Sequence, residues 1–100
     1  MKPARFHPDA EVELAAEARY YEERSPGLGE RFTREVEAAV ELASAFPQIG
    51  SRYRYGTRRV FPKRFPFSVV YQDVASELVI LANAPFPRKP GYWRGRRRDG

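Results

Sequence analysis

The placement of proline and glycine between two stretches of helical periodicity constrains this fold most. In the first stretch, apolar residues recur at intervals of four, four and three, which is the spacing of one helical face. These residues are Ala10, Leu14, Ala18 and Tyr21. Ser25-Pro26-Gly27 interrupts the pattern, and a second apolar stripe then runs to Phe46-Pro47. Two helices joined by so short a link must lie antiparallel, as a hairpin.

The first helix is expected to start at His7-Pro8-Asp9. Proline suits the first helical position because its missing N–H would be unpaired there in any case. Asp9 complements the positive end of the helix dipole. His7, the only histidine, is therefore expected to cap or pack the helix start rather than to act as a catalyst.

The second half of the chain changes to the period of strands. Short runs rich in Val, Ile, Phe and Tyr occupy residues 58–61, 67–73 and 78–83, and residues 3–7 can form a first strand. The order is β-α-α-β-β-β, which predicts an α+β fold with the helical hairpin packed on one face of a small, mainly antiparallel sheet. Residues 1–93 form one domain, and we expect Trp93 and Tyr92 to pack back onto the sheet. Residues 94–100 are expected to be a disordered basic tail.

Charge is distributed unevenly along the chain. The net charge is +5, yet residues 9–41 hold ten acids and four arginines. Residues 42–72 carry six basic side chains and no acid, and residues 88–98 carry six more. A one-sided positive surface favours an anionic partner, either nucleic acid or an acidic protein segment. The alternative is a solvated sheet edge that Lys and Arg protect from aggregation.

Several function classes are excluded by composition. The chain has no cysteine, which excludes disulfides and thiolate chemistry. No His–carboxylate spacing indicates a metal site, and no cofactor is expected. The longest apolar stretches are far shorter than the ~20 residues of a membrane span, and no signal peptide is evident, so a cytoplasmic protein without a membrane partner is expected.

Several segments together carry a resemblance to a known family. They are Phe6-His7-Pro8-Asp9-Ala10, Tyr20-Tyr21-Glu22-Glu23, Pro26-Gly27-Leu28-Gly29-Glu30-Arg31-Phe32, Phe46-Pro47, Arg58-Arg59, Arg64-Phe65-Pro66-Phe67-Ser68-Val69-Val70-Tyr71 and Pro90-Gly91-Tyr92-Trp93. In this order and spacing they resemble the RelE/ParE toxin superfamily over about residues 5–94. The members described as plasmid-stabilisation or ParE-like toxins are the most similar.

The resemblance implies a fold that agrees with the order of elements above, and it implies partners. The toxin of such a type II toxin–antitoxin system is neutralised by a cognate antitoxin, which wraps a helix or an extended segment around it. RelE-like members cut messenger RNA on the ribosome, whereas ParE-like members poison DNA gyrase. Both modes of action cause growth inhibition.

RNA cleavage without a metal needs groups that hold the phosphate, stabilise added negative charge and move protons. The candidate catalytic residues are Arg59, Lys63, Arg88 and Tyr92. In the RNA-cutting relatives an arginine stands three residues before the tyrosine of the middle strand, whereas this chain has Ser68 three residues before Tyr71. Serine carries no charge, and the segment Ala84-Pro85-Phe86-Pro87-Arg88 also departs from the pattern. Both departures favour a ParE-like toxin that acts on gyrase.

Two alternatives remain at this point. One is a ribosome-dependent endoribonuclease of the RelE type, and the other is a non-toxic, small, basic nucleic-acid-binding domain. In each case we expect the basic side chains around the middle strand to bind a partner, with an antitoxin segment over the sheet near Arg59, Lys63 and Arg88. The candidate partner-binding residues are Arg58, Arg59, Lys63, Arg64 and Arg88.

Overall fold

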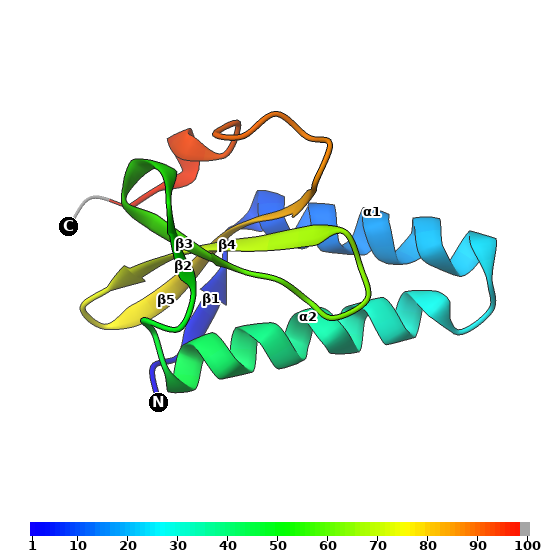
Figure 1. The fold of residues 1–100 in the computed structure, drawn as a ribbon, viewed down its shortest axis with the longest axis horizontal. Helices are drawn as coiled ribbons and strands as arrows, with labels where there is room; N and C mark the ends of the chain where they lie inside the picture. The colour runs from blue at the N-terminus through cyan, green and yellow to red at the C-terminus, as the bar shows by residue number, and fades with distance from the viewer. Residues whose placement is uncertain (99–100) are drawn as a thin grey trace.

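The protein forms two layers, a helical hairpin and a five-stranded sheet (Figure 1). The computed structural model describes residues 1–98. The elements in chain order are β1 (Ala4–Phe6), α1 (Pro8–Arg24), α2 (Leu28–Ala45), β2 (Ser51–Tyr53), β3 (Thr57–Val60), β4 (Phe67–Val74) and β5 (Glu77–Pro85). The strand order is β1-β5-β4-β3-β2, and every neighbouring pair is antiparallel except β1 with β5. The predicted α+β class and the helical hairpin on one sheet face are confirmed.

Both helices begin where local chemistry predicts. His7 caps α1 through its Nδ1, which accepts the backbone N–H of Asp9 at 3.1 Å. The start of α2 has no cap from its own side chain at Gly27. Glu22 of α1 supplies one instead, because its carboxylate accepts the backbone N–H groups of Gly27 at 2.9 Å and of Gly29 at 3.1 Å.

The two glycines of the hairpin have different roles. Gly27 has φ +87°, a left-handed conformation that glycine adopts without strain and that turns the chain between the helices. Gly29 lies inside α2, where a Cβ atom would stand 2.3 Å from the carbonyl oxygen of Ala18. Gly29 therefore serves the close approach of the two helices.

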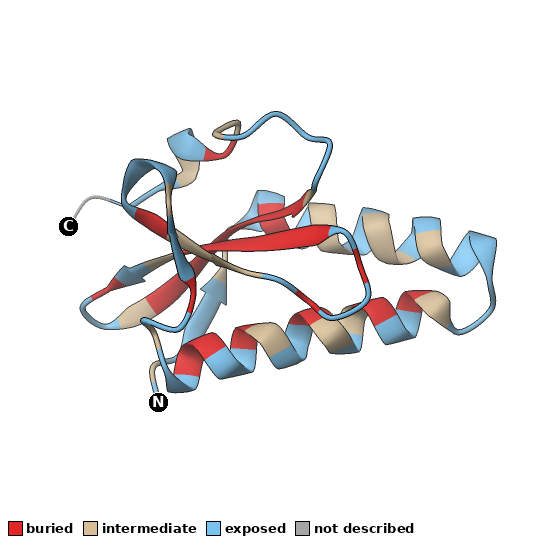
Figure 2. Ribbon diagram, in the orientation of Figure 1, coloured by how far each residue is buried: buried red, intermediate tan, exposed pale blue. Residues whose placement is uncertain are grey.

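The main core lies between the helices and the sheet. Figure 2 shows the buried residues of α2 along the side turned to the sheet. Phe32 of α2 stands at its centre, with its ring centroid 4.9 Å from that of Phe67 and 5.1 Å from that of Tyr21. Phe67 and Tyr71 of β4 are fully buried. Burial of these large side chains supplies most of the energy that holds the two layers together.

The face of the sheet opposite the helices, here called the open face, is partly covered by the C-terminal segment. Trp93 is 1% exposed and packs with Val70, Val79 and Leu81, which confirms its predicted return to the sheet. The chain continues as a 3-10 turn over Arg94–Arg96 beside the turn between β2 and β3 (Figure 1). A disordered tail was expected from residue 94, but residues 94–98 are held to the domain by ion pairs of Arg96 and Arg98. Residues 99–100 of that expected tail lie outside the described part of the chain.

Strand β2 was missed by the sequence prediction. It has only three residues and pairs with β3 across a short turn, with Tyr53 opposite Thr57. Tyr55 in this turn has φ +60°, which is unusual for a residue with a side chain. The strand forms because β3 offers a free edge for pairing. Residue periodicity and strand propensity in the sequence do not show that such an edge is available.

Candidate functional site

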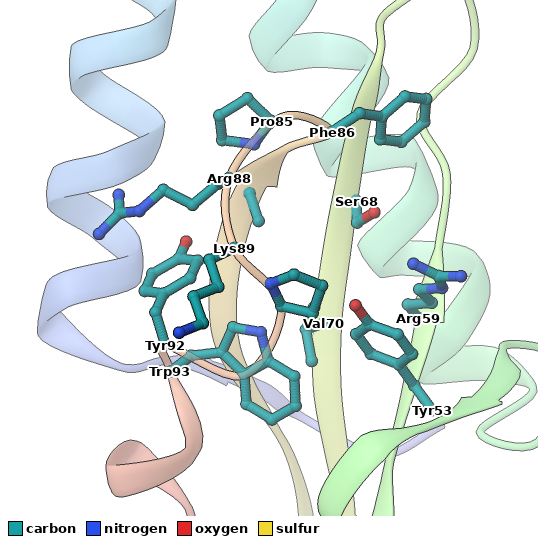
Figure 3. A pocket seen from close by; sticks show the side chains of 12 residues that line it. Tyr53, Arg59, Ser68, Val70, Pro85, Phe86, Arg88, Lys89, Tyr92 and Trp93 are labelled. Carbon is teal, nitrogen blue, oxygen red and sulfur yellow. The ribbon is translucent and has the colours of Figure 1, made fainter.

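A small hollow lies on the open face, between the sheet and the C-terminal segment (Figure 3). Its volume is about 80 Å³. It is lined by Tyr53, Arg59, Ser68, Val70, Ala84, Pro85, Phe86, Arg88, Lys89, Pro90, Tyr92 and Trp93. Pockets for small molecules usually hold ~300–1,000 Å³. The hollow therefore suits one side chain or one phosphate group of a larger partner rather than a whole small molecule.

Arg59 forms one wall of the hollow because of the register of β3. Arg59 pairs with Val70, whose side chain packs on the open face, and side chains alternate along a strand. The Arg59 guanidinium lies over the rings of Tyr53, at 4.0 Å, and Phe61, at 5.1 Å. Its Nε is buried and has no hydrogen-bond partner within residues 1–98. The stacked rings hold this cation in place while leaving donors in its plane free.

Arg88 and Tyr92 form the opposite wall. The Arg88 guanidinium lies 3.8 Å from the centre of the Tyr92 ring and points away from the hollow, toward α1 (Figure 3). Burial and the carboxylate of Glu13 raise the pKa of the Tyr92 phenol well above its usual range. At neutral pH this phenol keeps its proton, so it can donate a hydrogen bond but cannot serve as a general base.

A network of polar contacts anchors this wall. Glu13 of α1 accepts two N–H groups of Arg96, at 3.1 and 3.0 Å, and the backbone N–H of Asn83 at 3.0 Å. Arg96 also donates to the carbonyl of Leu81 at 2.9 Å, and its Nε lies 3.7 Å from the carboxylate of Asp9. The carboxylates nearest to the hollow are thus engaged with Arg96. They position the C-terminal segment rather than face a ligand.

The predicted site residues divide between two faces of the sheet. Arg59, Arg88 and Tyr92 line the hollow together, whereas Lys63 lines a separate groove beside α2. Arg58 points away from the open face and donates to the backbone carbonyls of Gln48 and Gly50 at 3.1 and 2.8 Å. Lys63 and Arg58, which were expected to bind a partner together with Arg59 and Arg88, therefore lie on other surfaces.

The reasons for this division are local. Arg58 and Arg59 are neighbours on one strand, so their side chains must point to opposite faces. Arg64 is exposed at the tip of the loop between β3 and β4, where its φ of +70° turns the chain. That loop carries Lys63 toward the helices. No pattern in the sequence announces such a turn at an arginine.

The lining residues that were not predicted to form the site include Tyr53, Ser68 and Lys89. Lys89 could have been found, because it adjoins Arg88 in a proline-bracketed segment that cannot join a helix. Ser68 had been noted only as a missing arginine, and it lies on β4 between the two walls (Figure 3). Tyr53 belongs to the strand that the sequence prediction missed.

The lining of the hollow is basic and could bind an anion. It includes Arg59 and Lys89, Arg88 with its guanidinium turned toward α1, and the hydroxyl groups of tyrosine and serine, but neither histidine nor carboxylate. Across residues 1–98, no three side chains of the His, Asp and Glu types gather as a metal site would need. Over the same range, no helix combines the length and the apolar character that crossing a membrane requires.

Comparison with known proteins agrees with the fold and identifies the family. A family model described as the ParE toxin of the type II toxin–antitoxin system parDE matches residues 4–98. The chain belongs to the ParE toxin family. The fold is similar to a solved chain of the chromosomal ParDE toxin–antitoxin system from P. aeruginosa, with a TM-score of 0.61 and 21% identity, covering 85% of this chain and 96% of that one. A search of curated proteins finds no significant match.

Membership of the ParE family confirms the resemblance to the RelE/ParE superfamily and assigns the chain to the toxins of type II systems. The family context also supports a cognate antitoxin as the partner of this ParE-family toxin. At 21% identity the similarity to the solved ParDE chain shows the shared fold.

Proposed function

We propose that this ParE-family toxin acts in the bacterial cytoplasm by binding DNA gyrase through the open face of its sheet. The observation that carries the proposal is the composition of the hollow, where cations stand on two walls without a histidine or a carboxylate between them. A cutting enzyme needs a positioned group that takes a proton from the attacking hydroxyl. An arrangement of donors without such a base favours binding over cleavage.

Ser68 supports the same conclusion from the middle strand. Its side chain lies on β4 between Arg59 and Arg88, at the position where RNA-cutting relatives carry an arginine. The loss of one donor that stabilises a developing negative charge typically lowers a rate by ~10²–10³. The Arg59 and Arg88 guanidinium groups do not converge on one point, because Arg88 points toward α1. A single phosphate would therefore not receive both.

The target is tested with two assays of the same purified toxin. We expect inhibited supercoiling and accumulated cleavage complexes when the toxin is added to gyrase and a plasmid. We expect no new ends when translated messenger RNA is analysed by primer extension in its presence. Codon-specific cuts without an effect on gyrase would contradict the proposal and support a RelE-type endoribonuclease. If the protein has no effect in either assay and its expression does not inhibit cell growth, it is a non-toxic nucleic-acid-binding domain.

The antitoxin is proposed to dock in the groove beside α2 where Lys63 lies. The groove has a volume of about 350 Å³ and lies between α2 and the end of β3. Leu42 and Phe61 both line this groove, with 46% and 47% of their surfaces exposed, so it offers a partner adjoining apolar side chains. An amphipathic antitoxin helix would cover both, with Lys63 and Glu35 at the margin for polar contacts.

This docking site is tested by binding measurements with a purified antitoxin. Leu42→Lys should weaken the complex at least about tenfold, since an ammonium group would enter an apolar contact. Val12→Lys is the matched control, because Val12 is 67% exposed on α1 and should not matter. The double variant Arg59→Glu, Arg88→Glu tests whether the antitoxin docks instead on the open face, as the sequence analysis predicts. If the Arg59→Glu, Arg88→Glu pair weakens the complex and Leu42→Lys does not, the antitoxin docks on the open face instead.

A further inference from the structure

The open face carries five basic side chains without a carboxylate partner among residues 1–98. These rim cations are Arg59, Arg88, Lys89, Arg94 and Arg97. The acids that lie near them are engaged elsewhere. Arg96 holds Glu13 and Asp9, and Glu77 pairs with Arg5 and Arg98. Within residues 1–98, no carboxylate therefore neutralises the positive charge of the rim.

Most rim cations are oriented by aromatic rings. Arg59 lies 4.0 Å from the centre of the Tyr53 ring, and Arg88 lies 3.8 Å from that of Tyr92. Arg94 and Arg97 stand 5.6 and 5.3 Å from the centre of the Tyr55 ring. A ring fixes a guanidinium by its face, while the N–H donors lie in the guanidinium plane. Arg97 already donates to the carbonyls of Arg94 and Tyr55, at 2.8 and 3.1 Å, and Arg94 donates to the Tyr55 hydroxyl at 3.4 Å. The remaining donors of these arginines can receive phosphate oxygens with little further loss of side-chain freedom.

The arrangement of the rim cations fits a polymer of regular charge. They extend from Arg88, whose guanidinium is turned toward α1, past Lys89 and Arg59 at the hollow to the turn at Tyr55, rather than converging on one point. The hollow itself, at about 80 Å³, is far smaller than the pocket that a flipped base would need. Contact with the outside of a nucleic-acid backbone is the mode of binding that remains.

We propose that the rim cations bind the phosphate backbone of duplex DNA directly and without sequence preference. This inference deepens the proposed function, because gyrase works on duplex DNA and a toxin bound to gyrase would have that DNA beside it. On this view the partner of the open face is the gyrase–DNA complex, and the rim contacts the DNA that gyrase holds. Backbone contacts of this kind are electrostatic, so their strength falls as salt displaces the bound phosphates.

The test measures binding of the full chain to a fluorescent DNA duplex of mixed sequence, without gyrase, over a series of salt concentrations. If all five rim cations contact phosphates, the slope of log K against log salt should be about −4.5. Arg88→Gln with Lys89→Gln should reduce its size by about 2, because each lost phosphate contact removes about 1. Neither side chain donates a hydrogen bond to residues 1–98, so both replacements should leave the fold intact.

The matched control removes two positive charges from the helical side. Arg19 and Arg31 are exposed on α1 and α2 without ion-pair partners among the described residues. Arg19→Gln with Arg31→Gln should leave the slope unchanged. An equal loss in this control would reduce the effect to net charge and overturn the inference. So would absent binding at about 50 mM salt, where backbone contacts are strong.

Two further outcomes separate the competing explanations. In a competition experiment, an oligoglutamate of equal charge is compared with unlabelled DNA for displacement of the labelled duplex. Displacement to the same extent would mean that the rim binds acidic protein segments, and it would overturn the inference. A toxin that inhibits gyrase but does not bind the duplex also overturns it, while the gyrase proposal stands. A toxin that binds the duplex but leaves gyrase active supports the inference and refutes the gyrase proposal.

Discussion

The contact between Glu13 and Arg96 gives the sharpest test of how the C-terminal segment is held. The two side chains are 13% and 16% exposed, so solvent screens their attraction only weakly. Glu13→Gln keeps the shape and an oxygen for the Asn83 N–H, but it leaves the Arg96 guanidinium with only the more exposed carboxylate of Asp9, at 3.7 Å, as a counter-charge. Arg96→Met removes that charge while keeping an apolar stem.

The magnitude follows from the burial of the pair. Removing one partner of a buried ion pair costs about 3–5 kcal/mol, and the retained amide and partial exposure lower this to about 2 kcal/mol for Glu13→Gln. The double-mutant cycle of Glu13→Gln and Arg96→Met should then give a coupling energy of about 1–2 kcal/mol. A loss of about 2 kcal/mol lowers the urea midpoint by about 1 M.

The assay is urea unfolding followed by the fluorescence of Trp93, the only tryptophan, which is buried three residues before Arg96. Glu11→Gln is the matched control, since Glu11 is exposed on the same helix and has no ion pair within residues 1–98. A coupling energy below about 0.3 kcal/mol would mean that the two side chains do not interact, because non-interacting sites add within that margin. The segment would then be held by Trp93 and by the contacts of Arg97 and Arg98.

Three further predictions concern the fold. Gly29→Ala should lower the free energy of unfolding by about 1–3 kcal/mol in urea, because its Cβ would stand 2.3 Å from the Ala18 carbonyl oxygen. An unchanged free energy of unfolding would mean that the helices do not meet at this point. Tyr71→Phe should cost about 1–3 kcal/mol in the same assay, because the buried N–H of Gly50 loses the hydroxyl that it reaches at 3.0 Å, and a neutral result would contradict that bond. The raised pKa of Tyr92 means that the folded state holds this proton more tightly than the unfolded state, so its contribution is present below about pH 10 and lost as pH rises further. Tyr92→Phe should therefore flatten the alkaline fall in thermal stability, and an identical pH profile would contradict the shift.

The parts of the fold that local chemistry controls could be predicted from sequence. Proline at the first position of α1 and the break at Pro26-Gly27 specify where the helices begin and turn. The apolar stripes place Phe32 in the core, and they do so without knowledge of the sheet. These signals act within a few residues, which is the range that a single sequence displays.

The rest depends on contacts between distant segments. The edge strand β2 forms only because it pairs with β3. Residues 94–98 are ordered because Arg96 pairs with Glu13, which lies 83 residues earlier in the chain. Lys63 was expected beside Arg59, but a loop that turns at Arg64 carries it to the helical side. Only the pairing of β3 with β4 decides that Arg59, and not Arg58, faces the hollow.

The central claim is that the open face of this ParE-family toxin binds its target. It is tested most directly by titrating gyrase supercoiling with wild-type toxin, with the Arg59→Glu and Arg88→Glu double variant, and with Lys63→Glu. If the open face binds the target, the double variant should need at least about tenfold more protein for equal inhibition, since repulsion replaces attraction at two positions, while Lys63→Glu should inhibit as wild type does. Full inhibition by the double variant, or loss of inhibition with Lys63→Glu alone, would show that the open face does not bind the target.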